Sequence, residues 1–142
     1  MQRGFTLIEL AIVLAVAGLV MIITLPQLGR LLDGIALERA AAEMTSGLAV
    51  ARNAAVMRAR RVRFSIAGDS LRLDQWTTEG WEAFRRWPGP DQVGVSVAVS
   101  NPEVVFGPLG IGWGAANTRI VLERGIGRAV ITTSRIGRIK RW

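Results

Sequence analysis

"RGFTLIELAIVL", residues 3–14, determines how this chain begins and how the rest of it is arranged. A single carboxylate, Glu9, stands at the head of an apolar run, and no charged side chain follows it until Arg30. The window from Leu10 to Gly29 holds 20 residues without a charge, which as a helix would span about 30 Å. That length is sufficient to cross the hydrocarbon core of a bilayer, so we expect a membrane helix.

Two ordinary interpretations of this run leave some of its features unexplained. A secretory signal peptide would use Arg3 as its basic region and Ala15-Val16-Ala17 as its cleavage site, but the apolar run continues through Leu25 without a polar break. A plain transmembrane anchor explains the length, but it leaves Glu9 as a cost of about 2.5–3.5 kcal/mol if the carboxylate lies deep in the bilayer. A carboxylate that snorkels alone to the interface is a further alternative.

The same stretch closely resembles the N-terminal signature of type IV pilins and of the pseudopilins of type II secretion systems. The resemblance implies that a prepilin peptidase cuts between Gly4 and Phe5, and that Phe5 becomes the N-methylated first residue of the mature chain. It also implies that Glu9 acts in the assembly of subunits into a fibre, with other pilins or pseudopilins as partners. Pro26 falls where many family members carry a proline within this helix.

Glu9 also needs a physical reason to stand at the head of an apolar helix. A carboxylate in the first turn of a helix is favoured by the helix dipole, but in an apolar setting it needs a cation as partner. A cut after Gly4 would create such a cation, the amine of Phe5, and the amine of one subunit could meet Glu9 of a neighbour. Arg3 on the short leader should stay cytoplasmic, which predicts a single-pass inner-membrane protein with its C-terminal domain in the periplasm.

The composition argues against an enzyme. The chain has no Cys, no His and no Tyr, which excludes zinc sites built on Cys or His, Cys–His nucleophiles, Ser–His–Asp triads and disulfides. A P-loop requires Gly-Lys followed by Ser or Thr, and Lys140, the only lysine, precedes Arg141. We therefore expect no catalytic residue, no metal and no cofactor.

The pattern of apolar residues predicts one long helix followed by strands. Pro26 should kink the helix near Thr24. Beyond it, one apolar stripe recurs at steps of four and three residues: Leu37, Ala41, Met44, Leu48, Ala51 and Ala55. The expected divisions are a leader at 1–4, a transmembrane half-helix at 5–29, an amphipathic half-helix at 30–61 and an antiparallel β domain at 62–142.

Within the β domain, alternating apolar residues predict a hairpin of 62–66 with 71–73 and a second hairpin of 119–124 with 128–133. Strands are also expected at 93–99 and 104–106, with a last strand within 134–142. Residues 77–92 are interpreted as an irregular connection packed by aromatic side chains. The glycine-rich residues 107–117 are interpreted as a flexible loop rather than a dinucleotide site, because a strand pattern follows them. The expected core comprises the helix stripe with Val62, Phe64, Val95, Val97, Ile120 and Val130.

One helix followed by about six strands predicts an α+β, pilin-like fold in which the helix stripe packs on an antiparallel sheet. The C-terminal region also resembles the branch of the family that groups the type II secretion protein H with FimT-type minor pilins. In that branch a phenylalanine-glycine segment, here Phe106-Gly107, precedes two strands and a terminal Gly-Arg, here Gly137-Arg138. This resemblance implies a minor pseudopilin of a type II secretion system.

A basic C-terminus supports an alternative function. Residues 119–142 hold seven basic side chains and one acidic side chain, so almost all of the net charge of +7 lies there. FimT-type minor pilins include members that bind DNA through Gly-Arg-any-Arg, and here Gly137-Arg138-Ile139-Lys140 ends in lysine instead. Lysine offers a phosphate a point charge rather than a planar fork. The candidate DNA contacts are Arg135, Arg138, Lys140 and Arg141, and a structural pilus subunit is a third possibility.

Overall fold

The computed structural model describes residues 6–114 and 116–142 of the chain. The expected cleavage and methylation residues, Gly4 and Phe5, lie outside the described residues. The elements in chain order are α1 (Leu7–Met57), β1 (Val62–Ile66), β2 (Ser70–Thr77), β3 (Gly80–Pro88), the 3₁₀ helix η1 (Pro90–Val93), β4 (Ser96–Val99), β5 (Glu103–Phe106), β6 (Thr118–Arg124), β7 (Gly127–Thr133) and β8 (Ile139–Arg141).

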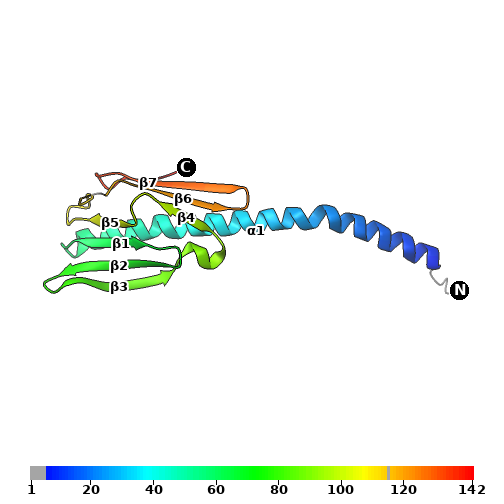
Figure 1. Cartoon of the computed structure of the whole chain (residues 1–142), viewed down its shortest axis with the longest axis horizontal. Helices are drawn as coiled ribbons and strands as arrows, with labels where there is room; N and C mark the ends of the chain where they lie inside the picture. Colours follow the sequence, from blue (N-terminus) through cyan, green and yellow to red (C-terminus); the bar gives the residue numbers. More distant parts are fainter. Residues whose placement is uncertain (1–5, 115) are drawn as a thin grey trace.

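α1 is a single helix of 51 residues, about 75 Å long. It ends at Met57, where the sequence predicted a helix through residue 61. Ala59 adopts a positive φ of 48°, and from Val62 the side chains follow the two-residue period of a strand. The helix continues through Pro26 without a break, and Figure 1 shows the blue, N-terminal half curving. The hydroxyl of Thr24 donates to the carbonyl of Val20 at 3.0 Å, a bond that also favours helix bending.

The strands form two antiparallel four-stranded sheets rather than one. The first sheet has the order β3-β2-β1-β5 and the second β4-β6-β7-β8. Both sheets lie alongside the cyan C-terminal half of α1, and the blue half projects away from them (Figure 1). The helix contacts β1, β2 and β5 of the first sheet and β6, β7 and β8 of the second. Both sheets therefore pack against the same helix.

The predicted helix stripe forms the centre of the core. All six of its residues are buried, and five of them, from Ala41 to Ala55, have no exposed surface. Gly47 also lies on this face, where an added Cβ would come within 2.7 Å of the ring of Phe64. Phe64 in turn stacks on Trp87 of β3, with 5.9 Å between ring centroids. The glycine therefore lets β1 approach the helix closely.

Three expectations for the β domain were wrong. Residues 77–92 are not an irregular connection, because residues 80–88 form β3, an edge strand paired with β2. Its side chains are mostly polar or half-exposed, so the two-residue apolar period is missing. The strand expected at 93–99 is limited to β4, since Val93 belongs to η1. On β7, Ala129 and Ile131 face the core and Val130 faces outward. The prediction that Val130 lies in the core was therefore wrong by one residue.

The glycine-rich segment, expected to be a flexible loop, is held by backbone hydrogen bonds along its described part. The amide of Gly112 donates to the carbonyl of Arg135 at 2.7 Å, and the amide of Trp113 donates to the carbonyl of Val105 at 2.8 Å. These bonds tie the segment to both sheets. The two predicted hairpins and the last strand are confirmed, as β1–β2, β6–β7 and β8.

The packing of α1 on the sheets predicts a large effect of one substitution. Met44→Asp should lower the free energy of unfolding by about 3 kcal/mol or more, because it buries an unpaired charge between helix and sheets. The matched control is Ala42→Asp, which adds the same charge on the exposed side of the same helix turn. Thermal unfolding of the full chain in detergent, followed by the near-ultraviolet dichroism of its tryptophans, should separate the two variants. Equal melting of both would mean that the buried face of the helix is assigned wrongly.

Candidate functional site

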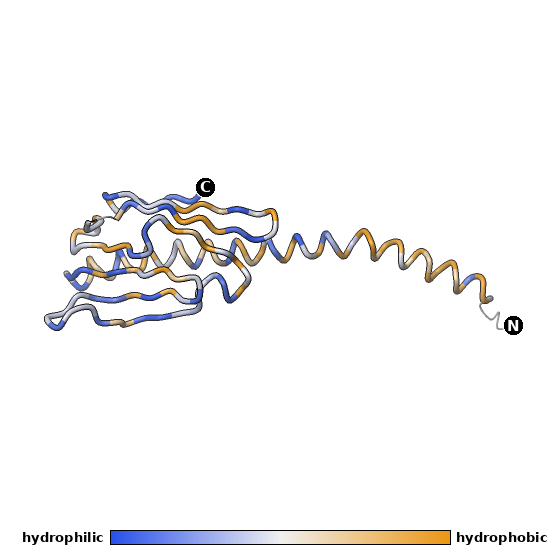
Figure 2. The backbone as a smooth tube through the Cα atoms, in the orientation of Figure 1, coloured by the Kyte–Doolittle hydropathy of each residue, from blue (hydrophilic) through white to orange (hydrophobic). Residues whose placement is uncertain are grey.

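The N-terminal half of α1 is an exposed apolar surface. Its large side chains lie open to the surroundings, with Leu7 88% exposed and Ile22 73% exposed, and the most apolar 18-residue window has no buried residue. In the described part of the chain, α1 is the one helix long and apolar enough to cross a membrane, by length and composition. Figure 2 shows this half in orange, in contrast with the mixed colours of the domain. A surface of this size has to be covered by lipid or by other apolar helices.

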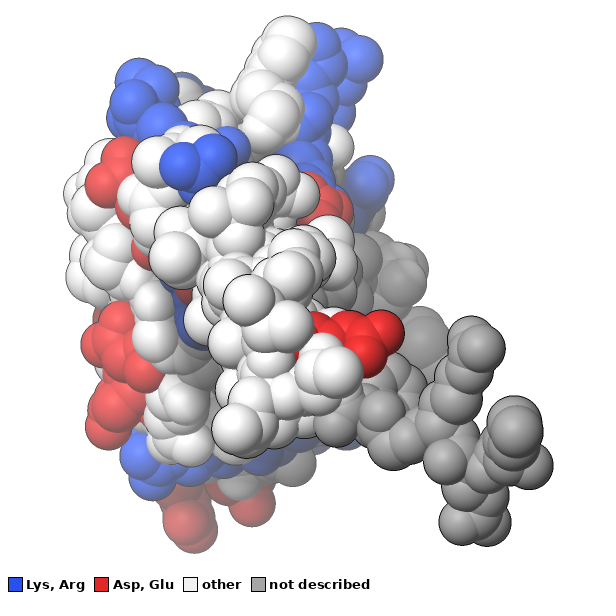
Figure 3. Space-filling view, turned by 90° about the vertical axis from the view of Figure 1, so that its right-hand side faces the viewer, with Lys and Arg blue, Asp and Glu red and all other residues white. Residues whose placement is uncertain are grey.

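Charged side chains gather away from this surface. Figure 3 views the molecule from the side of the helix N-terminus, and uncharged atoms fill most of the helix in the foreground. Lysine and arginine side chains gather mainly at the upper and lower edges of the view, over the domain behind. Between Thr6 and Gly29 the only charged residue is Glu9. This carboxylate is therefore the one group that can take part in an ionic interaction within the apolar half.

Glu9 occupies the third position of the helix and caps its own N-terminus. The amide of Glu9 donates to the hydroxyl of Thr6 at 3.3 Å, and the carboxylate of Glu9 accepts from the amide of Thr6 at 3.4 Å. This reciprocal pair is a capping box, which satisfies two amides that have no partner inside the helix. The exposed carboxylate thus lies beside Thr6, the first described residue, at the N-terminal end of the helix.

The four basic C-terminal residues do not form one free cluster. Arg135 and Arg138 are exposed in the turn between β7 and β8, and the exposed Lys140 lies in β8 with its ammonium 4.9 Å from the ring of Trp142. Arg141, the next residue of the same strand, points to the helix and forms an ion pair with Glu38. Three of the four predicted contacts are therefore available to an outside anion, and the fourth also has an internal partner.

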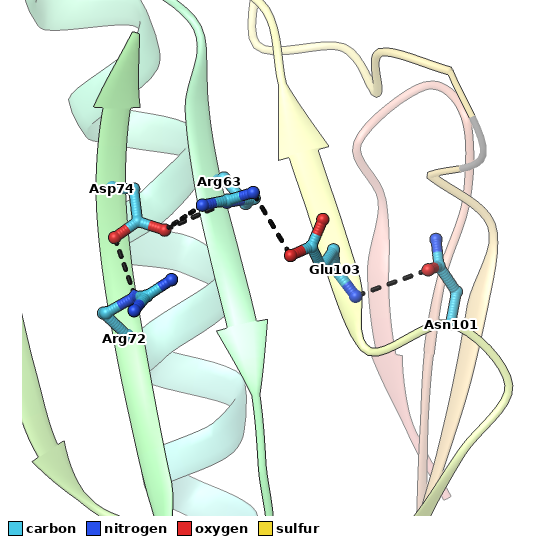
Figure 4. Close-up of polar contacts among 5 residues, drawn as sticks. All are labelled: Arg63, Arg72, Asp74, Asn101 and Glu103. Atoms are coloured by element: carbon cyan, nitrogen blue, oxygen red, sulfur yellow. Dashed lines mark hydrogen bonds and ion pairs between the residues drawn. The ribbon is translucent and has the colours of Figure 1, made fainter. Parts of the chain in front are cut away.

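A second charged network, which sequence reasoning missed, lies on the outer face of the first sheet (Figure 4). Asp74 of β2 is 1% exposed and pairs at 2.8 Å with both Arg63 of β1 and Arg72 of its own strand. Arg63 also pairs with Glu103 of β5 at 3.2 Å. The network links three adjacent strands. Because two guanidinium groups bond the carboxylate of Asp74, the arrangement ties neighbouring strands of the sheet together.

An aromatic groove lies at the end of the domain farthest from the apolar half. It has a volume of about 390 Å³ and is lined in part by Arg61, Trp76 and Trp113. The guanidinium of Arg61 lies 5.3 Å from the ring of Trp76 and 4.7 Å from that of Trp113. Over residues 6–114 and 116–142, no group of three or more acidic side chains could hold a metal ion. The groove offers stacking and contact area, which suits binding of another molecule.

Comparison with known families identifies the chain. The family described as type II transport protein GspH matches residues 40–137, which is more than half of the chain and includes most of the amphipathic half-helix and every strand from β1 to β7. This chain belongs to the type II transport protein GspH family. The prokaryotic N-terminal methylation motif matches residues 1–25, so the N-terminal resemblance is confirmed as well. No significant match occurs among curated proteins.

Two groups of solved structures share the fold of this GspH-family chain. The type IV minor pilin FimU of Pseudomonas aeruginosa is 20% identical, with a TM-score of 0.63 over 73% of this chain and 86% of FimU. The minor pseudopilin EpsH from the type II secretion system of Vibrio cholerae is 11% identical, with a TM-score of 0.62 over 75% of this chain and 95% of EpsH. The predicted α+β, pilin-like fold is thereby confirmed, and the GspH family supports a membrane-anchored minor pseudopilin subunit.

Proposed function

We propose that this GspH-family chain is inserted in the inner membrane through α1, cleaved after Gly4 and built into the periplasmic fibre of a type II secretion system as a minor pseudopilin. The observation that carries the proposal is the exposed apolar half-helix with its single carboxylate, Glu9, at the N-terminus. The fibre supports export of proteins across the outer membrane. The chain contributes surfaces for assembly and has no catalytic role, which agrees with its lack of His and Cys.

Processing creates the partner that Glu9 requires. Prepilin peptidase cuts between Gly4 and Phe5, and N-methylation leaves Phe5 with a cationic amine directly before Thr6. Arg3 holds the short leader on the cytoplasmic side until the cut, which places the β domain in the periplasm. The leader has no further role, so its removal exposes a helix that ends in a positive charge and carries one negative charge close by.

Assembly exchanges one partner of Glu9 for another. In the single chain the carboxylate accepts from the amide of Thr6 in a long bond of 3.4 Å, which is a weak interaction. In the fibre, the amine of Phe5 from a neighbouring subunit replaces it with a charge-assisted contact, which is shorter and stronger in an apolar environment. An unpaired carboxylate between packed helices would be costly. A subunit thus packs stably in the fibre only when its helix is aligned so that the amine of Phe5 meets Glu9 of its neighbour.

Processing predicts a defined mass. Protein from the membranes of a host that has prepilin peptidase should lack residues 1–4 and carry one additional methyl group, as measured by intact mass spectrometry. In a host without the peptidase the full chain should remain. A mature chain that begins near Gly18 would instead indicate an ordinary secretory signal and would contradict the proposed cut.

Assembly predicts that the charge of Glu9 is essential. Glu9→Ala and Glu9→Gln should both leave cleavage and insertion intact and should reduce crosslinking to partner pseudopilins to background, because neither side chain can pair with an amine cation. Glu9→Gln keeps a hydrogen-bond acceptor for the cap and so separates charge from capping. The matched control is Glu43→Ala, which removes an exposed carboxylate paired with Arg39 in the same helix. Normal crosslinking and secretion with Glu9→Gln would rule out the ionic role.

DNA binding is a second candidate, favoured by the exposure of Arg135, Arg138 and Lys140. Within the described residues no ion pair involves these three side chains. Three phosphate contacts predict that the logarithm of affinity falls with the logarithm of salt at a slope of about −3 for duplex DNA. Little sequence preference is expected, because contacts to phosphates carry no sequence information.

A double substitution distinguishes the two candidates. If the strand binds DNA, Arg138→Gln with Lys140→Gln should remove about two contacts and flatten the salt slope accordingly. The control is Arg85→Gln with Arg86→Gln, which removes the same charge from an exposed part of the first sheet. Fluorescence anisotropy of labelled duplex DNA with the full chain in neutral detergent provides the measurement. Micromolar binding at physiological salt that only the first pair abolishes would favour DNA uptake over secretion.

A further inference from the structure

The tip of the β6–β7 hairpin carries an exposed isoleucine. Gly125 and Ile126 form the two-residue connection between Arg124 and Gly127, and Ile126 is 92% exposed. Gly125 has a φ of 57°, which fits the first position of such a turn. Turn tips usually carry Gly, Asn, Asp, Ser or Pro, so a large apolar side chain at this position has no role in the turn itself.

Contacts with α1 fix the position of this tip along the helix. Arg124 pairs with Asp33 at 2.7 Å. A Cβ added to Gly125 would lie 2.8 Å from the carboxylate of Asp33, and one added to Gly127 would lie 2.8 Å from the side chain of Leu37. The tip therefore lies against the turn of α1 that contains Asp33. In Figure 1 the hairpin reaches the side of the domain from which the apolar half of the helix projects.

The membrane-spanning segment sets the height of the tip above the bilayer. Asp33 follows Gly29, the last residue of the charge-free window, by four residues, or about 6 Å of helix rise. A bilayer is about 40–45 Å thick with its polar layers and about 30 Å thick without them, so each polar layer measures roughly 5–8 Å. The tip of the hairpin thus lies at the level of the lipid headgroups.

The surface around the tip has the composition of a membrane interface. Leu31, Leu32 and Ile35 of the helix are exposed, as is Arg30, which directly precedes Leu31. In the hairpin, Arg128 is exposed two residues after Ile126. Of the nearby carboxylates, Asp33 is paired with Arg124 and Glu123 with Arg128. Arg30 has no ion pair among the described residues. Apolar side chains flanked by arginine fit the boundary between acyl chains and anionic headgroups.

We propose that the β6–β7 hairpin tip is a lipid-contacting site, in which Ile126 inserts among the headgroups and Arg30 contacts anionic lipid. The proposal goes beyond the assembly function and rests only on the anchoring of the chain by α1. The contact holds the β domain at a set orientation on the membrane before assembly. It is lost when the subunit moves out of the bilayer into the fibre.

Single cysteines test this contact, since the chain has none of its own. An environment-sensitive fluorophore is attached to Leu19→Cys, Ile126→Cys or Ile136→Cys in the full chain. Leu19 reports on the membrane helix, and Ile136 is the matched control, an isoleucine 69% exposed in the turn between β7 and β8. Each protein is placed in vesicles of phosphatidylcholine, with or without phosphatidylglycerol, that contain a lipid with a spin-label quencher at the headgroup.

The label at residue 126 should be quenched several-fold more strongly than the label at residue 136, and more so with phosphatidylglycerol. Its emission should shift to the blue at every protein-to-lipid ratio. Equal quenching at residues 126 and 136, with Leu19 embedded, would overturn the proposal. A blue shift of the label at residue 126 that occurs only at a high protein-to-lipid ratio would also overturn the proposal. It would mean that the tip contacts a neighbouring subunit rather than lipid. A solvent-accessible label at Leu19 would instead contradict anchoring by α1.

Discussion

The structure depends on one continuous helix that has to be covered in two different ways. One face of the C-terminal half of α1 is covered by the two sheets of its own chain, and among the described residues nothing covers the N-terminal half. Apolar surface gains roughly 25 cal/mol per Å² when it leaves water, so the second half is stable only in lipid or against other apolar helices. Because the helix is unbroken, the domain has to follow wherever the apolar half goes.

Lipid and helix neighbours cover apolar side chains about equally well, which gives Glu9 its importance. Lipid tails are as apolar as leucine, so the hydrophobic effect alone does not favour fibre over membrane. What differs between the two environments is packing and the partner that is available to the carboxylate. In the single chain the carboxylate of Glu9 accepts only long bonds, from the amide and the hydroxyl of Thr6. A neighbouring amine offers a better partner. This difference favours the fibre over the membrane, and it favours the alignment of subunits that brings the amine to Glu9.

The domain is oriented on the helix by packing, with ion pairs at its edges. Asp33 pairs with Arg124 and Glu38 with Arg141, and all four side chains are partly exposed, so each pair is screened by solvent and contributes little stability. Their effect is on position. They hold the second sheet against the segment of α1 that leaves the membrane, which brings the hairpin tip to the headgroups and turns the side chain of Arg141 toward the helix.

Sequence reasoning succeeded where one physical pattern dominated. The helix stripe from Leu37 to Ala55 and both hairpins followed from periodicity, and the N-terminal motif predicted the family. It failed where tertiary contacts decided the outcome. β3 is a strand because β2 supplies its hydrogen bonds, although its own side chains lack the apolar period. The pair between Arg141 and Glu38 joins residues 103 positions apart, so no local pattern could show that this arginine has a partner within the chain.

In the proposed fibre, Glu9 of one subunit meets the amine of Phe5 of another. A zero-length carbodiimide reagent joins a carboxylate to an amine only when the two groups touch. It should be applied to fibres assembled from a mixture of isotopically heavy and light subunits, followed by proteolysis and mass spectrometry. We expect a crosslinked peptide that joins residue 5 to Glu9 in mixed heavy–light pairs. Crosslinks found only within one chain, or a Glu9 that reacts with reagent alone, would contradict it.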